Sequence, residues 1–175
     1  MINGKVLHAS HDGIHVLRFV GDIRYTLSPS IDRFVKQLFS GPPPAGFVID
    51  LTETDGIDST NLGLLARIAK SMRTLNGSRV TILSDRSDIT AVLTSMAFDE
   101  VFDIVSHTSL DTEAEKELAR QSADKETLTH TVLEAHRALI ELSEHNEQMF
   151  RDVVTALEKN MKAVGDDKSG VKSVR

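Results

Sequence analysis

The sequence contains no cysteine, so disulfide bonds, thiolate catalysis and zinc–thiolate sites are excluded. Tryptophan is also absent, and aromatic residues make up only 5% of the chain. The net charge is −6, and no cluster of Lys and Arg offers the basic face that nucleic-acid binding needs. No apolar run reaches the roughly 18 residues of a membrane span, and the first ten residues lack a signal-peptide run. We therefore expect a cytoplasmic protein.

Glycine-rich phosphate loops are missing as well, because neither G-x-x-x-x-G-K-[ST] nor G-x-G-x-x-G occurs. We expect no cofactor. The chain does have 175 residues, of which 40% are apolar. That is enough for one compact core and an additional segment.

Strand-like and helix-like segments alternate as far as residue 106. Gly13 lies in a turn between two strands, Ser28-Pro29 is a typical helix start, and Asn76-Gly77 is a typical helix end. The predicted order is β-β-α-β-α-β-α-β, with strands at 5–9, 14–20, 47–51, 80–83 and 101–105 and helices at 28–39, 59–75 and 87–96. This alternation predicts an α/β fold, a mixed and largely parallel sheet with helices packed on it. The first hairpin would supply an antiparallel edge.

The composition changes after residue 110, because residues 111–164 contain no Gly or Pro. Apolar residues recur there at alternating spacings of three and four, which predicts a long amphipathic helix. One seam consists of Leu128, Val132, Ala135, Leu139, Leu142, Asn146, Met149, Val153, Ala156 and Asn160. A second stripe beside it consists of Leu133, Ile140, Phe150, Val154, Leu157 and Met161.

A single helix over 124–162 would be roughly 60 Å long at about 1.5 Å per residue. With two apolar stripes it must pair with another chain, fold back as a hairpin, or lie on the domain. A hairpin would bend at 143–147, whereas a buried Asn146 could set the register of a coiled coil. We expect a domain at 1–109, a helical extension at 110–165 and a disordered tail at 166–175.

Residues 47–69 contain the most informative pattern. A short apolar strand leads through a polar loop, 52–58, into a helix whose first residues are Ser59 and Thr60. Asp58 or Ser59 can serve simply as the helix N-cap. Ser59 can also be a phosphate acceptor, because a helix N-terminus tolerates and holds an anion. The two interpretations are compatible.

Three other kinds of site are disfavoured. A serine hydrolase would need a histidine base, but no G-x-S-x-G elbow is present and no histidine lies near Ser59 in the sequence. His8, His11 and His15 lie on the first hairpin without a metal-binding pattern, so we expect them to be surface histidines. His136 on the long helix lacks the Lys-Gly that usually follows a phosphotransfer histidine.

The segment Asp58-Ser59-Thr60-Asn61-Leu62-Gly63-Leu64-Leu65, preceded by Val48-Ile49-Asp50-Leu51, resembles the STAS domain of anti-sigma-factor antagonists. Members of that family carry Asp-Ser-[Ser/Thr]-Gly-Leu-Gly at this junction. Gly21-Asp22 resembles the family's Gly-[Glu/Asp] after the second strand. The resemblance covers residues 3–107. Asn61 stands where the family usually has Gly, Arg24-Tyr25 differ from many relatives, and the helical tail lies outside the common pattern.

The resemblance implies a non-catalytic partner-switching regulator. The unphosphorylated domain would bind an anti-sigma factor or serine kinase, the kinase would phosphorylate Ser59, and a PP2C-type phosphatase would reverse the modification. Thr60 is a secondary candidate for modification. The expected partner-binding residues are Asp22, Arg24, Tyr25, Asp55, Asp58, Asn61 and Leu62. The extension at 124–162 would form a homodimer or a second docking surface. The alternative is a constitutive scaffold that assembles a signalling complex through this extension.

Overall fold

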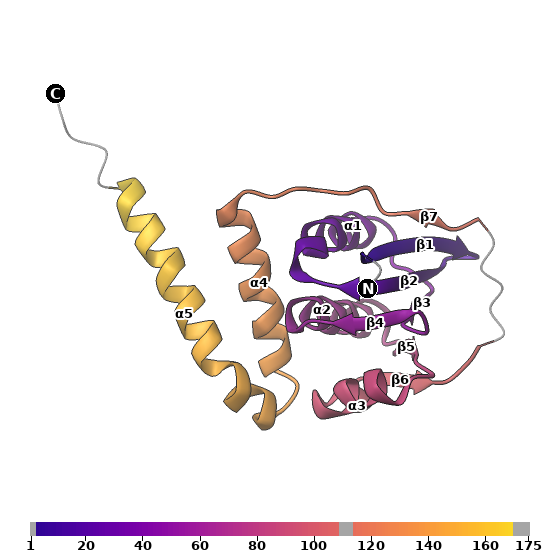
Figure 1. Cartoon of the computed structure of the whole chain (residues 1–175). Coiled ribbons are helices and arrows are strands. Elements are labelled where there is room, and N and C mark those ends of the chain that lie inside the picture. The colour runs from indigo at the N-terminus through magenta and orange to yellow at the C-terminus, as the bar shows by residue number, and fades with distance from the viewer. Residues whose placement is uncertain (1–2, 109–113, 170–175) are drawn as a thin grey trace.

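The computed structural model describes residues 3–108 and 114–169, and Figure 1 shows its elements. The strands are β1 (Lys5–His11), β2 (Ile14–Ile23), β3 (Gly46–Asp50), β4 (Thr54–Ile57), β5 (Val80–Leu83), β6 (Phe102–Val105) and β7 (Lys116–Glu117). The α-helices are α1 (Ser28–Ser40), α2 (Ser59–Asn76), α3 (Ser87–Ser95), α4 (Lys125–Ile140) and α5 (Glu144–Ser169). Two short 3-10 turns, Tyr25–Leu27 and Phe98–Glu100, precede α1 and follow α3.

The strands form one mixed sheet in the order β6-β5-β3-β2-β1-β7. β2, β3, β5 and β6 are parallel to one another, whereas β1 pairs antiparallel with β2. The crossovers between the parallel strands contain α1, α2 and α3, as in other sheets of this class. The predicted α/β fold with a largely parallel sheet is therefore confirmed.

Two strands were not predicted from the sequence. Residues Thr54–Ile57, expected as part of a polar loop, form β4 and pair in parallel with the end of β2. The pairing shifts register at Gly21, whose φ of 84° suits glycine. The other, β7, is two charged residues long and pairs with the outer side of β1, so β1 is not the edge strand.

Alternation along the central strands fills two apolar clusters. Leu17 and Phe19 of β2 and Ile49 of β3 face the main core, where they meet α1 and α2. Val16 and Val48 point to the opposite face and form a smaller cluster with Leu83. Every element from β1 to β6 except β4 contributes at least one buried residue to the main core. The core is therefore largely built before the helical extension begins.

The extension is a helical hairpin in which α4 and α5 pack against each other, with the bend at 141–143 (Figure 1). Asn146 stabilises this corner: its side-chain nitrogen donates to the carbonyls of Met96 (2.9 Å) and Leu139 (3.0 Å). Ser143 accepts from the Asn146 backbone N–H at 3.1 Å. Of the three arrangements open from the sequence, the chain combines two, because the extension folds back as a hairpin and also lies on the domain.

The bend divides the apolar seam. The part of the seam on α4 faces the domain, with Ala135 and Leu139 fully buried. In the part on α5, Met149 and Val153 are 45% and 40% exposed. A continuous coiled-coil seam over 128–160 is therefore not formed. The second stripe does make the α4–α5 contact, where Phe150 and Val154 are buried. α5 continues to Ser169, so the helix includes the start of the segment expected as a disordered tail; residues 170–175 lie outside the described residues.

Residues 114–124, which lead into α4, run across the domain (Figure 1). This connection is fixed by hydrogen bonds. The Leu118 backbone N–H donates to Val6 (2.8 Å), Arg120 donates to the Gly4 carbonyl (2.6 Å), and the Gln121 N–H donates to Ser30 Oγ (2.9 Å). This connection runs along β1 and α1, which places the start of α4 beside the helix layer.

Candidate functional site

The site is centred on the start of α2. Asp58 is the N-cap, and its Oδ1 accepts from the backbone N–H (3.0 Å) and the side-chain nitrogen (2.9 Å) of Asn61. Ser59 is the first helical residue and is half-buried. The N-cap is thus Asp58, which leaves the Ser59 hydroxyl free of a capping role. Its Oγ lies beside free helix N–H groups and the positive end of the helix dipole.

The Ser59 hydroxyl is hydrogen-bonded to His136 of α4, with 2.9 Å between Oγ and Nε2. The other ring nitrogen, Nδ1, lies 2.7 Å from the Val132 carbonyl. A carbonyl can only accept, so Nδ1 carries the proton and Nε2 accepts from Ser59. His136 is 4% exposed and also contacts Phe150 edge-on. No histidine lies near Ser59 along the chain, as the sequence shows, but the fold brings His136 to it from 77 residues away.

One stripe of α2 faces α4 along its length. Its residues recur at helical spacing. Ser59 contacts His136, Gly63 lies against Ala135, and Lys70 pairs with Glu141, the residue that follows α4, while Ala66 and Ala138 line the same cleft. Gly63 permits the closest approach, because a Cβ there would lie 2.8 Å from the Ala135 Cα. Lys70 and Glu141 form an exposed ion pair of 2.8 Å at the far end. The extension therefore covers the same side of α2 that carries Ser59.

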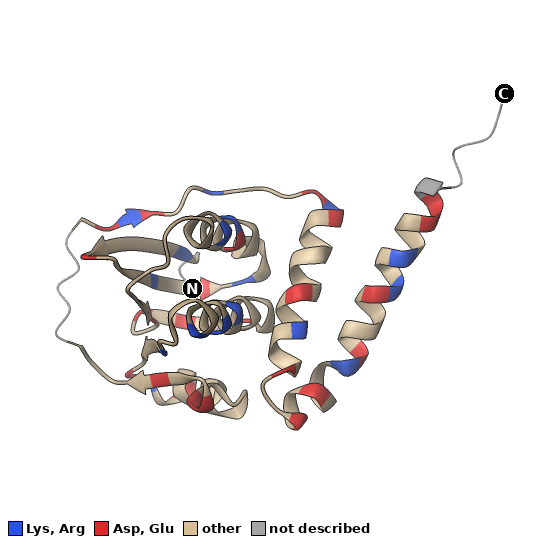
Figure 2. Ribbon diagram, turned by 180° about the vertical axis from the view of Figure 1, so that it is seen from behind, with Lys and Arg blue, Asp and Glu red and all other residues tan. Residues whose placement is uncertain are grey.

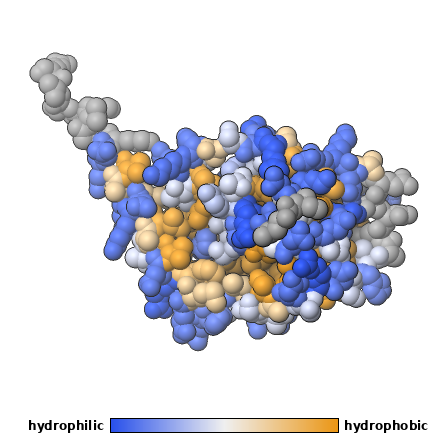
Figure 3. Space-filling model, viewed as in Figure 1, coloured by the Kyte–Doolittle hydropathy of each residue, from blue (hydrophilic) through white to orange (hydrophobic). Residues whose placement is uncertain are grey.

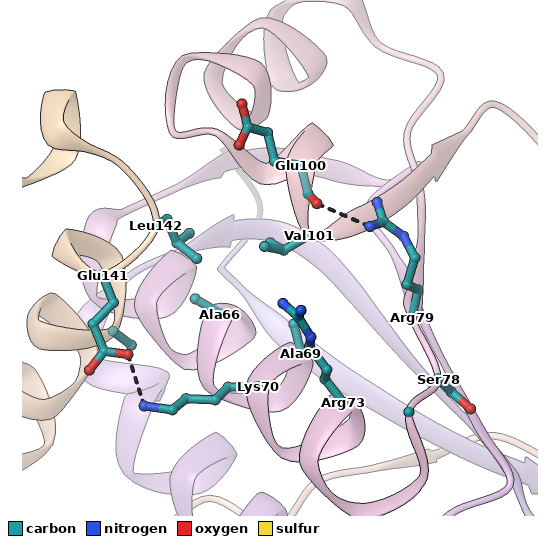
Figure 4. Close-up of a pocket in the computed structure, with 12 residues that line it drawn as sticks. Ala66, Ala69, Lys70, Arg73, Ser78, Arg79, Glu100, Val101, Glu141 and Leu142 are labelled. Carbon is teal, nitrogen blue, oxygen red and sulfur yellow. Dashed lines mark hydrogen bonds and ion pairs between the residues drawn. The ribbon is translucent and has the colours of Figure 1, made fainter.

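This interface opens into a cleft at the C-terminal end of α2 (Figure 4). The cleft has a volume of about 690 Å³, and Lys70, Arg73 and Arg79 line it together with Val101 and Leu142. Arg79 is fixed there by the Glu100 carbonyl (3.0 Å) and by Asp103 (2.9 Å). Packing between α2 and α4 is thus tight at Gly63 and loose beyond Ala66.

The expected partner-binding residues divide into two groups. Arg24, Tyr25 and Asp55 are exposed, and Tyr25 shows half of its surface (51%). Asp22 and Asp58 are half-buried beside them. Arg24 Nε donates to Asp22 Oδ2 at 2.8 Å, and this hydrogen bond raises the pKa of the guanidinium. These residues form a mixed-charge surface next to Ser59.

Asn61, Leu62 and Thr60 lie inside instead. Asn61 is 0% and Leu62 1% exposed, so neither side chain reaches the surface in this arrangement. Asn61 serves the Asp58 cap, and Leu62 belongs to the main core. Thr60 is 5% exposed, which makes it much less accessible than its neighbour Ser59.

Asp55 extends the acidic part of this surface towards α3. Its carboxylate pairs with Arg86 at 3.1 Å, and Arg86 also binds Asp88 at 2.9 Å. Hydrogen bonds to Asp88 and then to Asp55 raise the pKa of the Arg86 guanidinium. Acidic and basic groups are therefore largely matched around the loop before any modification.

Of the histidines of the first hairpin, expected at the surface, His11 is exposed, but His8 and His15 are partly buried. His8 and His15 are stacked, with Nε2 and Nδ1 2.9 Å apart, and His8 packs on Phe34. Within residues 3–108 and 114–169 no group of three or more His, Asp or Glu side chains is arranged to hold a metal ion. His136 is buried with both nitrogens engaged, so it offers no nitrogen for phosphotransfer. No helix among the described residues combines the length and apolarity needed to cross a membrane.

Comparison with known proteins agrees with this geometry. The sequence model of the STAS domain matches residues 6–114. A crystal structure described as an anti-sigma factor antagonist from Mycobacterium paratuberculosis has a similar fold, with a TM-score of 0.53 and 19% sequence identity. The match covers 60% of this chain and 87% of that one. A search of curated proteins finds no match.

The family match ends at residue 114, shortly before β7 and the helical hairpin. It includes the whole sheet except β7, the three crossover helices and the Asp58–Ser59 junction. The extension that covers Ser59 is an addition to the matched domain. The chain therefore belongs to the STAS domain family and carries a C-terminal helical extension folded onto the family's characteristic helix.

Proposed function

We propose that this protein is a bacterial partner-switching regulator, an anti-sigma factor antagonist. In the unphosphorylated form it binds an anti-sigma factor or a related serine kinase through the surface around Ser59. Phosphorylation of Ser59 ends that binding, and a PP2C-type phosphatase restores it. The protein acts by binding and not by catalysis, in the cytoplasm, where sigma factors meet RNA polymerase.

The position of Ser59 is the observation that carries this proposal. Ser59 follows the Asp58 cap directly and begins α2, where a phosphate would meet unpaired N–H groups and the positive end of the helix dipole. A phosphate adds about −1.5 to −2 charges at neutral pH. Asp55 and Asp58 are already present in this loop, so the modified surface would become strongly acidic and would repel a partner that fits the neutral form.

The residues around Ser59 divide between contacting a partner and fixing the start of α2. Asp22, Arg24, Tyr25 and Asp55 offer side chains to a partner, whereas Asn61 and Leu62 hold the start of α2 in place from inside. Thr60 is buried, so we assign the modification to Ser59.

The test is co-purification with tagged wild type, Ser59→Ala and Ser59→Asp from the native cells, together with mass spectrometry of the peptide that contains Ser59. We expect Ser59→Asp to lose the partner that wild type and Ser59→Ala retain. Ser95→Asp is the matched control, because Ser95 is exposed on α3 and the change adds the same charge elsewhere. Equal capture by Ser59→Asp and wild type would refute the switch.

The scaffold alternative and the predicted homodimer both depend on the outer face of α5. Met149, Val153 and Val164 are exposed there, and Figure 3 shows apolar residues along the hairpin surface. Figure 2 shows acidic and basic residues interspersed along the same helix. Val153→Glu would abolish a dimer or scaffold contact at this face and leave the Ser59 surface unchanged. Light scattering of wild type and Val153→Glu, followed by co-purification with each, separates this role from the Ser59 switch.

A second candidate function is serine hydrolysis, favoured only by the Ser59–His136 hydrogen bond. His136 Nε2 is placed to accept the Ser59 proton, as a general base would. Against it, His136 is only 4% exposed and packs edge-on against Phe150 of α5. A fluorophosphonate probe would label wild type but not Ser59→Ala if this function were present, and we expect no labelling of either.

A further inference from the structure

We propose that the side of α2 carrying Ser59 is a helix-binding surface, that α4 of the same chain is its resting occupant, and that a partner reaches Ser59 by replacing α4. The inference deepens the proposed function, since it uses Ser59 as the switch, and adds how access to it is controlled. It makes the extension an internal competitor of the partner.

Three separate contacts hold α4 in this position. His136 accepts from Ser59 at one end, Gly63 packs on the Ala135 main chain in the middle, and Glu141 pairs with Lys70 at the other end. They involve polar, steric and ionic complementarity along one stripe of α2. The fit is therefore specific, and not a general apolar contact.

A phosphate on Ser59 and a docked α4 exclude each other. Only 2.9 Å separates Ser59 Oγ from His136 Nε2, which is hydrogen-bond distance and leaves no space for a phosphoryl group between them. Phosphorylation would also remove the hydroxyl proton that His136 accepts. A kinase must therefore work on a form in which α4 has moved away.

The domain can lose this contact without losing its core. Among the described residues that are buried in the main cluster, Ala135, Leu139 and Phe150 come from the extension, and Leu118, Ala138, Ile140 and Leu142 pack against the cluster while partly buried. The Lys70–Glu141 pair is exposed, and exposed pairs stabilise by about 1 kcal/mol or less. The cleft beside it leaves one end of the interface less closely packed. Release of the hairpin thus leaves the sheet and its three crossover helices packed.

The same geometry defines the partner that fits. It presents a helix whose main chain lies against Gly63 as the Ala135 main chain does. It also places a hydrogen-bond acceptor over the Ser59 hydroxyl. Unmodified Ser59 can donate to that acceptor and phosphoserine cannot, so one surface binds α4 or the partner only in the unphosphorylated form.

The absence of cysteine allows a direct test in the full-length chain. Ser59→Cys introduces a single thiol whose rate of reaction with a maleimide reports exposure of this position. The second change is Ala135→Glu, which places a long charged side chain at a fully buried position of α4 whose main chain contacts Gly63. The matched control is Ala156→Glu, the same substitution at an exposed position of α5.

If position 59 can be reached only when α4 has moved away from α2, the rate of the maleimide reaction is proportional to the fraction of molecules in that open form. Ala135→Glu should then raise this rate by about tenfold or more. Ala156→Glu should leave the rate unchanged. Hydrogen exchange of the wild type provides a measurement that needs no variant: α4 amides should exchange before those of β3 and β5.

Two results would overturn the proposal. One is a Ser59→Cys rate in the native protein equal to the rate in denaturant, which would mean that α4 does not cover the site. The other is protection of α4 as strong as that of β3 and β5, which would make α4 a permanent part of the core. Neither measurement uses a partner or kinase, so failure of the proposed function would leave these results intact and would be recognised separately.

Discussion

Gly63 of α2 packs directly on the main chain of Ala135 in α4, so that a Cβ at position 63 would lie 2.8 Å from the Ala135 Cα. A methyl group there must push α4 away. In an isolated helix, by contrast, Gly→Ala stabilises by roughly 0.5–1 kcal/mol. The sign of the effect at Gly63 therefore reports whether α4 is docked.

We predict that Gly63→Ala destabilises the full-length protein by about 1–3 kcal/mol, the usual cost of overpacking. Gly165→Ala is the matched control, because nothing lies within 4 Å of a Cβ at that position of α5. It should be neutral or slightly stabilising. Urea unfolding of both variants measures the difference, and a stabilised Gly63→Ala would show that α4 does not pack on α2.

The Asp58 cap should be required for the geometry of Ser59. Asp58→Ala removes the acceptor of both Asn61 hydrogen bonds and should destabilise by about 0.5–2 kcal/mol. Asp58→Asn keeps a capping oxygen and should recover most of that loss. If the two variants unfold at the same urea concentration, the carboxylate charge and not the cap stabilises this junction.

Asn146 should anchor the corner of the hairpin. Asn146→Ala leaves the Met96 and Leu139 carbonyls without their donor in a buried position, which typically costs about 1–3 kcal/mol. Asn160→Ala, at an exposed position of α5, is the control and should change little. Thermal unfolding followed by circular dichroism measures both. Equal midpoints for the two variants would contradict the anchoring role.

The His8–His15 pair should make stability fall in mild acid. Burial lowers the pKa of both side chains from 6.5, and the neighbouring His15 lowers that of His8 further. The unfolded chain then binds protons more readily than the folded one, so this contribution is complete above pH 6.5 and is lost as pH falls through the folded-state pKa values.

The measurement is the unfolding midpoint as a function of pH for the wild type and for His8→Gln/His15→Gln. We expect the wild-type midpoint to decline more steeply below pH 6.5 than that of the double variant. His11→Gln is the control, since His11 is exposed in the turn. Parallel profiles for the wild type and the double variant would assign the acid sensitivity to other groups.

The sequence predicts the sheet and α2 well because their signals are local. Apolar runs such as 47–51 identify buried strands, and Gly77, with φ 72°, ends α2 as Asn76-Gly77 predicts. β4 has no such signal, since Thr54–Ile57 includes Asp and Gly and becomes a strand only by pairing with β2. Two charged residues, Lys116 and Glu117, likewise become β7 only because β1 offers an open edge.

The candidate site likewise depends on a contact between distant segments that has no local signal in the sequence. Ser59 and its Asp58 cap are predicted from their position before an apolar helix, but His136 lies 77 residues away in the sequence. Two features of the sequence are compatible with this contact without identifying it: the apolar seam of the extension that includes Ala135 and Leu139, and Gly63 within a helix otherwise rich in Leu. Helical periodicity says that such a face must be covered, but not by which segment.

The connection fixed along β1 and α1 has a consequence for affinity. Gln121 is hydrogen-bonded to Ser30 of α1, and α4 begins at Lys125, so at most about 10 Å of chain, residues 122–124, tethers α4 to that contact. A helix on so short a tether keeps an effective concentration of about millimolar order at its site. A partner must compete with α4 at that local concentration. Only a partner whose affinity for the α2 surface is high enough to displace α4 therefore binds.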